Sequence, residues 1–348
     1  MSDGRPGGLL NRQTAGRLLV GATLGGVALW LTFRRTDLRL VVTSVERVHP
    51  LLVLLALALV ATTVTAVARR WQLLVCRGEA PRRLPRFLAA VVTSQMLNVV
   101  LPIRLGEAAR AYWISRTEHR PLGRIVATIV VERLADVLML GVSVSVLLVY
   151  VALPSWARHS GEVALGASLA AAAAAIVLGK WGASVLRALE WPLLILPERM
   201  RMVLIQQGRV ALAELRAFGG WRSNLTVWAL SVLIVTLAAA TNYVLFLAFD
   251  LPLPPTTALL VFVVLQIGGA PASTPGNLGV FHYLTVLVLT AFGVDRTVAV
   301  AYAIVLHAVA VGPKIIAGAV MIGLASTSVF EPAGWRQSVL QATRSPGG

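Results

Sequence analysis

The sequence has little charge and almost no cysteine. Of its 348 residues, 13% are charged and 57% are hydrophobic, whereas a soluble domain carries about 25% charged residues. The composition therefore excludes an ordinary soluble domain and indicates a polytopic membrane protein. A single cysteine, Cys76, excludes an internal disulfide and a cysteine-based metal cluster.

Motifs for metal, cofactor or catalytic chemistry are also missing. The five histidines show no spacing typical of metal ligands. The sequence has no hydrolase triad, P-loop, kinase signature or dinucleotide-binding motif in a βαβ context. We therefore predict no metal, no cofactor and no enzymatic activity.

Acidic residues are scarce as well, with 15 Asp and Glu against 31 Lys and Arg. A net charge of +16 is compatible with a nucleic-acid partner. The arginines, however, lie in short segments between apolar runs and form no basic face with aromatic residues. Their placement follows the positive-inside rule of membrane proteins, so we predict no nucleic-acid partner.

Six apolar runs approach the length of about 20 residues that a membrane-spanning helix needs. They cover residues 18–33, 51–68, 125–153, 163–179, 225–249 and 297–325. Two further apolar stretches, 87–101 and 256–292, are interrupted by proline and glycine. We predict an all-α polytopic membrane protein with six full transmembrane helices and two re-entrant helical hairpins.

Charge decides the topology. If residues 87–101 turn back through 106–115 as a hairpin, 23 of the 31 Lys and Arg residues lie on one side, which includes both termini. This places both termini in the cytoplasm of a plasma-membrane protein. The two halves then have opposite orientations, as in an inverted-topology repeat. The second hairpin could equally be two short crossings, because both arrangements preserve the sidedness.

The predicted domain organisation is simple. Residues 1–17 and 326–348 are cytoplasmic tails, and residues 18–325 form one transmembrane domain with halves at about 18–153 and 163–325. Between the halves, apolar residues recur at helical spacing beside arginines over 199–218. This pattern fits a basic amphipathic helix on the cytoplasmic leaflet or, equally, a solvated linker helix.

The two interruptions are the candidate translocation site, because broken backbone at membrane depth needs protein or a water-filled cavity beside it. The first interruption contains Asn98, Arg104, Gly106, Glu107 and Arg110. The second contains Ser273, Thr274, Pro275, Gly276 and Asn277. A half-helix beginning near Gly106 would direct the positive end of its dipole at the first break, which suits an anion.

Further charges lie inside predicted spans. Glu132 and Asp136 share a helical face, and Arg133 lies three residues from Asp136. Together with Arg104, Glu107 and Arg110 they make three positive and three negative charges. Such a set can line a pathway and hold a phosphate on its arginine forks, or it can simply pair helices. His307 and Lys314 also share a face, where Lys314 either faces the pathway or extends to the cytoplasmic surface.

Three motifs in order resemble the flippase-like family of membrane proteins that shares the lysylphosphatidylglycerol synthase transmembrane region. They are Asn98…Leu101-Pro102…Arg104-Leu105-Gly106-Glu107…Arg110, then Glu132-Arg133…Asp136, then Thr274-Pro275-Gly276-Asn277-Leu278-Gly279-Val280. The resemblance implies a lipid translocase domain with re-entrant helices and no aminoacyltransferase domain. His282 stands where the family commonly has glutamate.

From the breaks, the charges and the resemblance, we predict a protein that moves an anionic or phosphate-bearing lipid, or a lipid-linked carrier, across the plasma membrane. Two alternatives stay open. One is an ion-coupled transporter of small solutes, and the other is a non-transporting subunit of a membrane glycosyltransferase. The predicted partners are thus a membrane lipid or lipid-linked substrate and, as a further partner, a membrane-bound glycosyltransferase or lipid-modifying enzyme.

Overall fold

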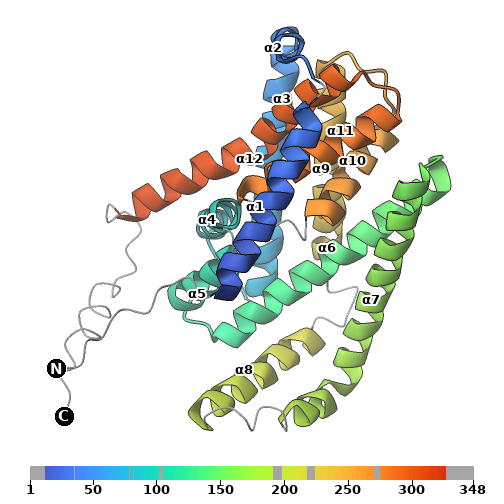
Figure 1. The fold of residues 1–348 in the computed structure, drawn as a ribbon. Coiled ribbons are helices and arrows are strands. Elements are labelled where there is room, and N and C mark those ends of the chain that lie inside the picture. The colour runs from blue at the N-terminus through green and yellow to red at the C-terminus, as the bar shows by residue number, and fades with distance from the viewer. Residues whose placement is uncertain are drawn as a thin grey trace, which may run out of the picture.

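The protein was analysed as a computed structural model that describes residues 12–34, 36–77, 79–80, 82–101, 105–190, 198–217, 224–269 and 275–326. Throughout these residues the secondary structure is helical, with no strand (Figure 1). The long helices are α1 (Arg12–Phe33), α3 (Pro50–Val75), α6 (Leu122–Tyr150), α7 (Ser155–Glu190), α9 (Leu225–Ala248) and α12 (Arg296–Ser326). The remaining helices are α2 (Leu38–Glu46), α4 (Leu84–Val100), α5 (Gly106–Thr117), α8 (Glu198–Ala217), α10 (Pro255–Gly269), the 3-10 turn η3 (Pro275–Asn277) and α11 (Val280–Ala291).

The six long helices lie where the six apolar runs predicted them. Among the described residues, α3, α9 and α12 are long and apolar enough to cross a membrane by length and composition. The largest difference in extent is at α7, which covers Ser155–Glu190 where 163–179 was predicted. The second is at α3, which continues past the predicted end at Ala68 to Val75. Neither glycine nor proline interrupts this extension, so the helix has no local reason to stop.

The two interrupted stretches each form a pair of shorter helices, as predicted. In the first pair, α4 ends at Val100 and α5 begins at Gly106, whose backbone N–H donates a hydrogen bond to Asn98 Oδ1 at 2.8 Å. This bond satisfies one of the free N–H groups at the start of α5. In the second pair, η3 lies between α10 and α11.

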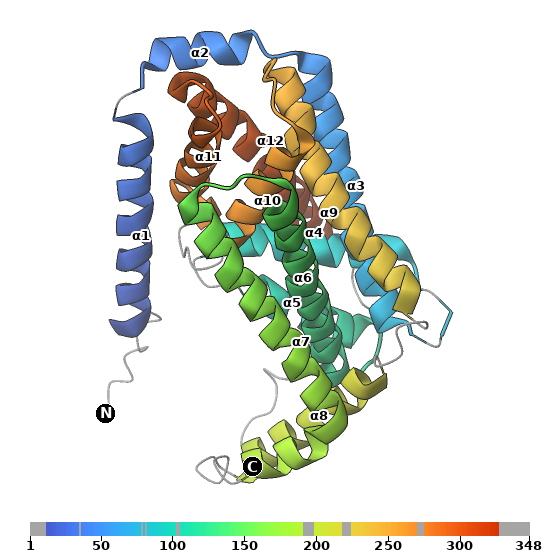
Figure 2. The same ribbon diagram turned by 90° about the vertical axis from the view of Figure 1, so that its right-hand side faces the viewer.

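Two helices lie at opposite ends of the bundle (Figure 2). The sequence did not indicate α2, which begins after Asp37, whose carboxylate accepts a hydrogen bond from the Arg39 backbone N–H at 2.9 Å. At the other end, α8 confirms the predicted helix between the halves. It packs against α6 and α7, and Gln207 Oε1 accepts a hydrogen bond from Gly123 N–H at 2.6 Å. Its contacts therefore do not fit a detached linker.

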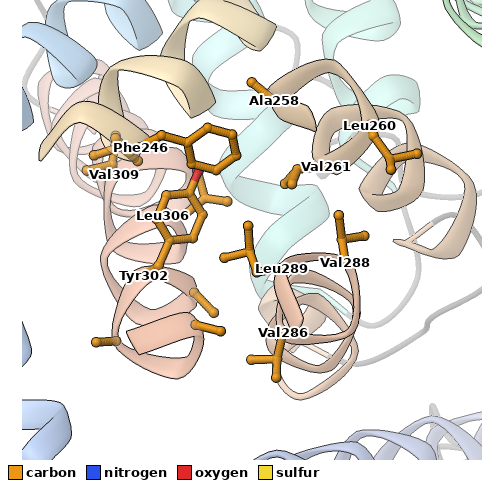
Figure 3. Close-up of a cluster of buried hydrophobic side chains, with 14 of the residues drawn as sticks. Phe246, Ala258, Leu260, Val261, Val286, Val288, Leu289, Tyr302, Leu306 and Val309 are labelled. Carbon is orange, nitrogen blue, oxygen red and sulfur yellow. The ribbon is translucent and has the colours of Figure 1, made fainter. Parts of the chain in front are cut away.

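The helices enclose two hydrophobic clusters. The larger cluster joins α9, α10, α11 and α12 around the buried rings of Phe246 and Tyr302, which are 5.3 Å apart (Figure 3). Its one buried hydroxyl among these rings, Tyr302 OH, donates to the Asn242 carbonyl at 3.1 Å. The smaller cluster joins α3, α4, α5 and α6, where the rings of Trp71 and Phe87 meet edge to face at 5.6 Å.

The two clusters are joined by α3 and α9, which lie side by side and run in opposite directions (Figure 2). The start of α3 meets the end of α9, where His49 N–H donates to the Ala248 carbonyl at 3.1 Å. Near the other end of α3, Glu79 pairs with Arg120 and ties the α3–α4 turn to the α5–α6 turn. The hydrogen bond from Arg120 holds the pKa of the Glu79 carboxyl below its usual value.

The contact between α5 and α4 generates a first prediction. A Cβ added to Gly106 would overlap the Ser94 carbonyl of α4, whereas a Cβ on Gly166 of α7 would meet nothing within 4 Å. Alanine normally stabilises a helix by about 0.5–1 kcal/mol relative to glycine. We therefore expect Gly166→Ala to keep or raise the thermal unfolding midpoint in detergent, and Gly106→Ala to lower stability by about 1–3 kcal/mol. Equal midpoints for the two variants would show that α4 and α5 are not in close contact.

Candidate functional site

The centre of the candidate site is Glu132, whose side chain is 1% exposed in the middle of α6. Both of its oxygens are bound by the guanidinium of Arg110, with Arg110 Nη1 at 3.2 Å from Oε2 and Nη2 at 3.3 Å from Oε1. Arg110 comes from α5, the second half-helix of the first break. The planar two-point contact fixes the position of α5 against α6.

A second arginine, Arg70 of α3, completes the buried part of the site. Its Nη2 lies 2.7 Å from Asp136 Oδ1 and 3.8 Å from Glu132 Oε1, and its Nη1 donates to Ser231 Oγ of α9 at 3.0 Å. Arg70 lies beyond the predicted end of the second span at Ala68, so the sequence did not place it in the site. In the structure α3 continues and Arg70 is 1% exposed. The uninterrupted helical sequence after Ala68 was the available signal.

Arg133 is the accessible arginine of the group, with a side chain 51% exposed. Its Nη2 lies 3.1 Å from Glu107 Oε1 and 3.3 Å from Glu132 Oε1, and its Nη1 lies 3.0 Å from Asp136 Oδ2. It therefore joins α5 to the face of α6 that carries both carboxylates. Glu132 and Asp136 share one face of α6, as predicted, since Arg70 contacts both, and Arg133 pairs with Asp136 at i+3.

An aromatic ring supports the arginines. The guanidinium carbon of Arg110 lies 4.6 Å from the ring centroid of Trp71. Trp71 Nε1–H in turn donates to Thr128 Oγ1 at 3.0 Å, which holds the indole between α3 and α6. Because Arg110 is stacked and paired at once, its fork is already occupied.

We call Arg70, Arg110, Arg133, Glu107, Glu132 and Asp136 the charge network. It contains three cations and three anions, so it is neutral when all six groups are ionised. Moving an unpaired ion into a low-dielectric interior costs several kcal/mol, and pairing offsets this cost. The sequence predicted five of the six members but assigned the third cation to Arg104, which lies outside the described residues.

The second break is built on backbone conformation. Three of its residues have positive φ: Gly276 at 65°, Asn277 at 53° and Gly279 at 87°. The Gly276 carbonyl accepts a hydrogen bond from His307 Nε2 of α12 at 2.9 Å, so Nε2 carries the hydrogen. The His307 ring lies 4.8 Å from that of His282. Ser273 and Thr274 lie outside the described residues.

The two breaks meet at the end of α4. The turn η3 packs against α4, and Val99 lies beside Gly276. Asn98, one residue earlier, holds the start of α5, so a single turn of α4 contacts both breaks. Lys314 is separate from this junction: it is half-buried on α12 and has no ion pair within the described part of the chain.

These features define a class, an α-helical membrane protein with two interrupted helical hairpins and a buried charge network beside the first of them. Residues 18–318 match the family described as the lysylphosphatidylglycerol synthase TM region, and the chain belongs to this family. The match confirms the resemblance found in the sequence motifs and relates the protein to lipid handling. No curated protein matches the chain.

The charge network predicts a non-additive pair of substitutions. Arg70→Met removes the 2.7 Å partner of Asp136, which is 30% exposed and keeps its contact with Arg133, so we expect a loss of about 1–3 kcal/mol of stability. In Arg70→Met/Asp136→Leu both charges are gone, and much of that loss should be recovered. The measurement is thermal unfolding in detergent. Arg69→Met is the matched control, because the fork of Arg69 contacts the side-chain oxygen of Gln72 and, among the residues that the structure describes, pairs with no acid. Additive effects of the two substitutions would contradict the pairing.

Proposed function

We propose that the protein translocates an anionic or phosphate-bearing lipid, or a lipid-linked carrier, across the plasma membrane. The observation that carries the proposal is Arg133, a half-exposed guanidinium at the edge of a charge network in which Arg70, Arg110 and Glu132 are buried. The family relationship to lipid handling supports it from an independent side.

The chemistry of Arg133 suits a phosphate. A guanidinium presents paired N–H groups in a plane, which match the oxygens of a phosphate or carboxylate. Arg110 and Arg70 are buried and occupied. Of the three carboxylates that Arg133 contacts, Glu107 and Asp136 are 34% and 30% exposed, whereas Glu132 is buried. A phosphate can therefore exchange with Glu107 and Asp136 at the exposed end while Glu132 keeps its pairs with Arg110 and Arg70.

The arrangement of the helices supports an inverted repeat. We propose that α3–α6 and α9–α12 are equivalent units, because their contacts correspond. In one unit α4 packs on α12 of the other, and α10 packs on α6 in return. With α1 and α7 added, this gives six full crossings and two re-entrant hairpins, with α8 on the cytoplasmic side and α2 on the outer side.

The proposed orientation predicts cysteine accessibility. We expect a cysteine at exposed Arg83, after α3, to react with a membrane-impermeant maleimide only from the cytoplasmic side, and a cysteine at exposed Arg158, at the start of α7, only from outside. The native Cys76 is buried and gives the background. The measurement compares labelling of whole cells and inverted vesicles. Reaction of both positions from the same side would contradict the proposed topology.

The proposed headgroup contact predicts that Arg133→Lys is impaired although it keeps the charge. An ammonium cannot reproduce the two-point fork, so we expect transport of fluorescent phosphatidylglycerol in proteoliposomes to fall about tenfold, which corresponds to about 1.4 kcal/mol. Arg158→Lys, an exposed arginine of α7 that pairs only with Glu162 among the described residues, is the matched control. Thermal unfolding shows whether Arg133→Lys is folded.

The same liposomes distinguish the alternatives. Equal transport of phosphatidylglycerol and a neutral diacylglycerol would remove the phosphate from the mechanism. Uptake of a small solute without lipid movement would favour the ion-coupled transporter. Neither activity, together with the loss of a membrane glycosyltransferase's activity when the chain is deleted, would favour the accessory subunit.

A further inference from the structure

An apolar groove lies between α6, α9 and α10. Its volume is about 480 Å³, within the range of about 300–1,000 Å³ typical of ligand sites. Its walls consist of Met139, Val142, Ser143, Val146, Val232, Val235, Thr236, Ala239, Ala240, Tyr243, Pro255, Thr256 and Leu259. Val142 and Val232, on facing walls, are each 54% exposed, so the groove opens on the outer surface of the bundle.

The groove suits hydrocarbon and offers little to a polar solute. The hydroxyl of Ser143 donates to the Met139 carbonyl at 2.8 Å, and that of Thr236 donates to the Val232 carbonyl at 3.0 Å. Each of these two hydroxyls thus donates its one hydrogen within its own helix, and most of the wall consists of methyl and methylene groups. A water-soluble substrate would lose its hydration here without receiving a hydrogen bond from either hydroxyl.

The inner end of the groove is the charge network. Met139 and Ser143 follow Asp136 at i+3 and i+7 on α6, and Val235 follows Ser231 at i+4 on α9, so both walls continue the same helical faces. Asp136 and Ser231 are both held by Arg70, with contacts of 2.7 Å and 3.0 Å. The groove walls therefore lead along α6 to Asp136, which is 30% exposed, and along α9 to Ser231, which Arg70 holds in the buried part of the network.

We propose that this groove binds one hydrocarbon chain of the lipid whose charged headgroup meets Arg133 at the network. The inference rests on the proposed function for the headgroup, and it adds a specific place for the chain. Because the network lies toward the α8 end and the groove runs toward the start of α10, the bound lipid points its head to the α8 side. In the proposed topology this is the orientation of a lipid from the cytoplasmic leaflet.

The experiment uses the full chain in vesicles of phosphatidylethanolamine and phosphatidylglycerol that contain phosphatidylglycerol with a diazirine on one acyl chain. After irradiation, labelled peptides are identified by mass spectrometry. We expect label on the groove walls within 139–146 and 232–243. Ala239→Trp fills the groove and should lower this label about tenfold, since the chain loses burial of two or more methylenes.

The matched control is Leu233→Trp, which places the same ring on the 42% exposed face of α9 outside the groove and should leave the groove label unchanged. If Ala239→Trp fails to fold, Val142→Trp on the opposite wall, where the side chain is 54% exposed, repeats the test. Groove label equal to that on exposed Val163 and Leu169 of α7, and insensitive to the groove-filling substitutions, would overturn the proposal.

Three further outcomes bear on this inference, and the last two separate it from the proposed function. A disulfide-linked dimer through Val142→Cys, with no lipid label, would show that a second copy of the chain occupies the groove and would overturn the inference. Groove label as expected without lipid transport would uphold the chain site and overturn the proposed function. Transport that depends on Arg133, without groove label, would do the reverse.

Discussion

The ion pairs of Glu132 are the interaction on which the rest of the first half depends. A carboxylate this deeply buried is tolerable only with cations beside it, and these come from two other elements, Arg110 of α5 and Arg70 of α3. Each arginine is in turn positioned by a neighbour, Arg110 by Trp71 and Arg70 by Ser231. A chain of polar contacts therefore fixes α3, α5, α6 and α9 where an apolar core alone would allow them to slide.

The interrupted hairpins are held by a different means, namely backbone contacts. Gly106 of the first break bonds to Asn98, and Gly276 of the second accepts from His307. Since η3 packs on the end of α4, the two breaks are in contact through the same turn of α4. The helices that flank the second break, α10 and α11, both pack in the larger apolar cluster around Phe246 and Tyr302.

The sequence was sufficient for the helices other than α2 and for most of the charge network, because hydropathy sets the spans and helical spacing sets which charges share a face. It was not sufficient for Arg70, since an arginine at the end of an apolar run looks the same whether it faces the cytoplasm or a buried acid. Ser231 and Trp71 could not be predicted either, because a serine or a tryptophan in a membrane helix looks the same whether or not it contacts a buried arginine. The groove could not be predicted either, because the residues along it, such as Ala239 and Val235, are ordinary for a membrane helix and only the packing of α6, α9 and α10 separates them.

The first helix is attached to the bundle unevenly. At its end, the carbonyls of Leu31 and Thr32 accept hydrogen bonds from Arg296 of α12, and the chain continues into α2, which also packs on α12. Earlier in α1, the backbone of Gly25 lies against Gly279, so two backbone segments meet there without a side chain between them. The end of α1 is thus hydrogen-bonded to α12, whereas its middle contacts the second break through glycine backbone alone. Any rigid displacement of α1 that keeps the Arg296 bonds must pivot about Leu31, and such a pivot would uncover the positive-φ turn of the second break toward the surrounding lipid.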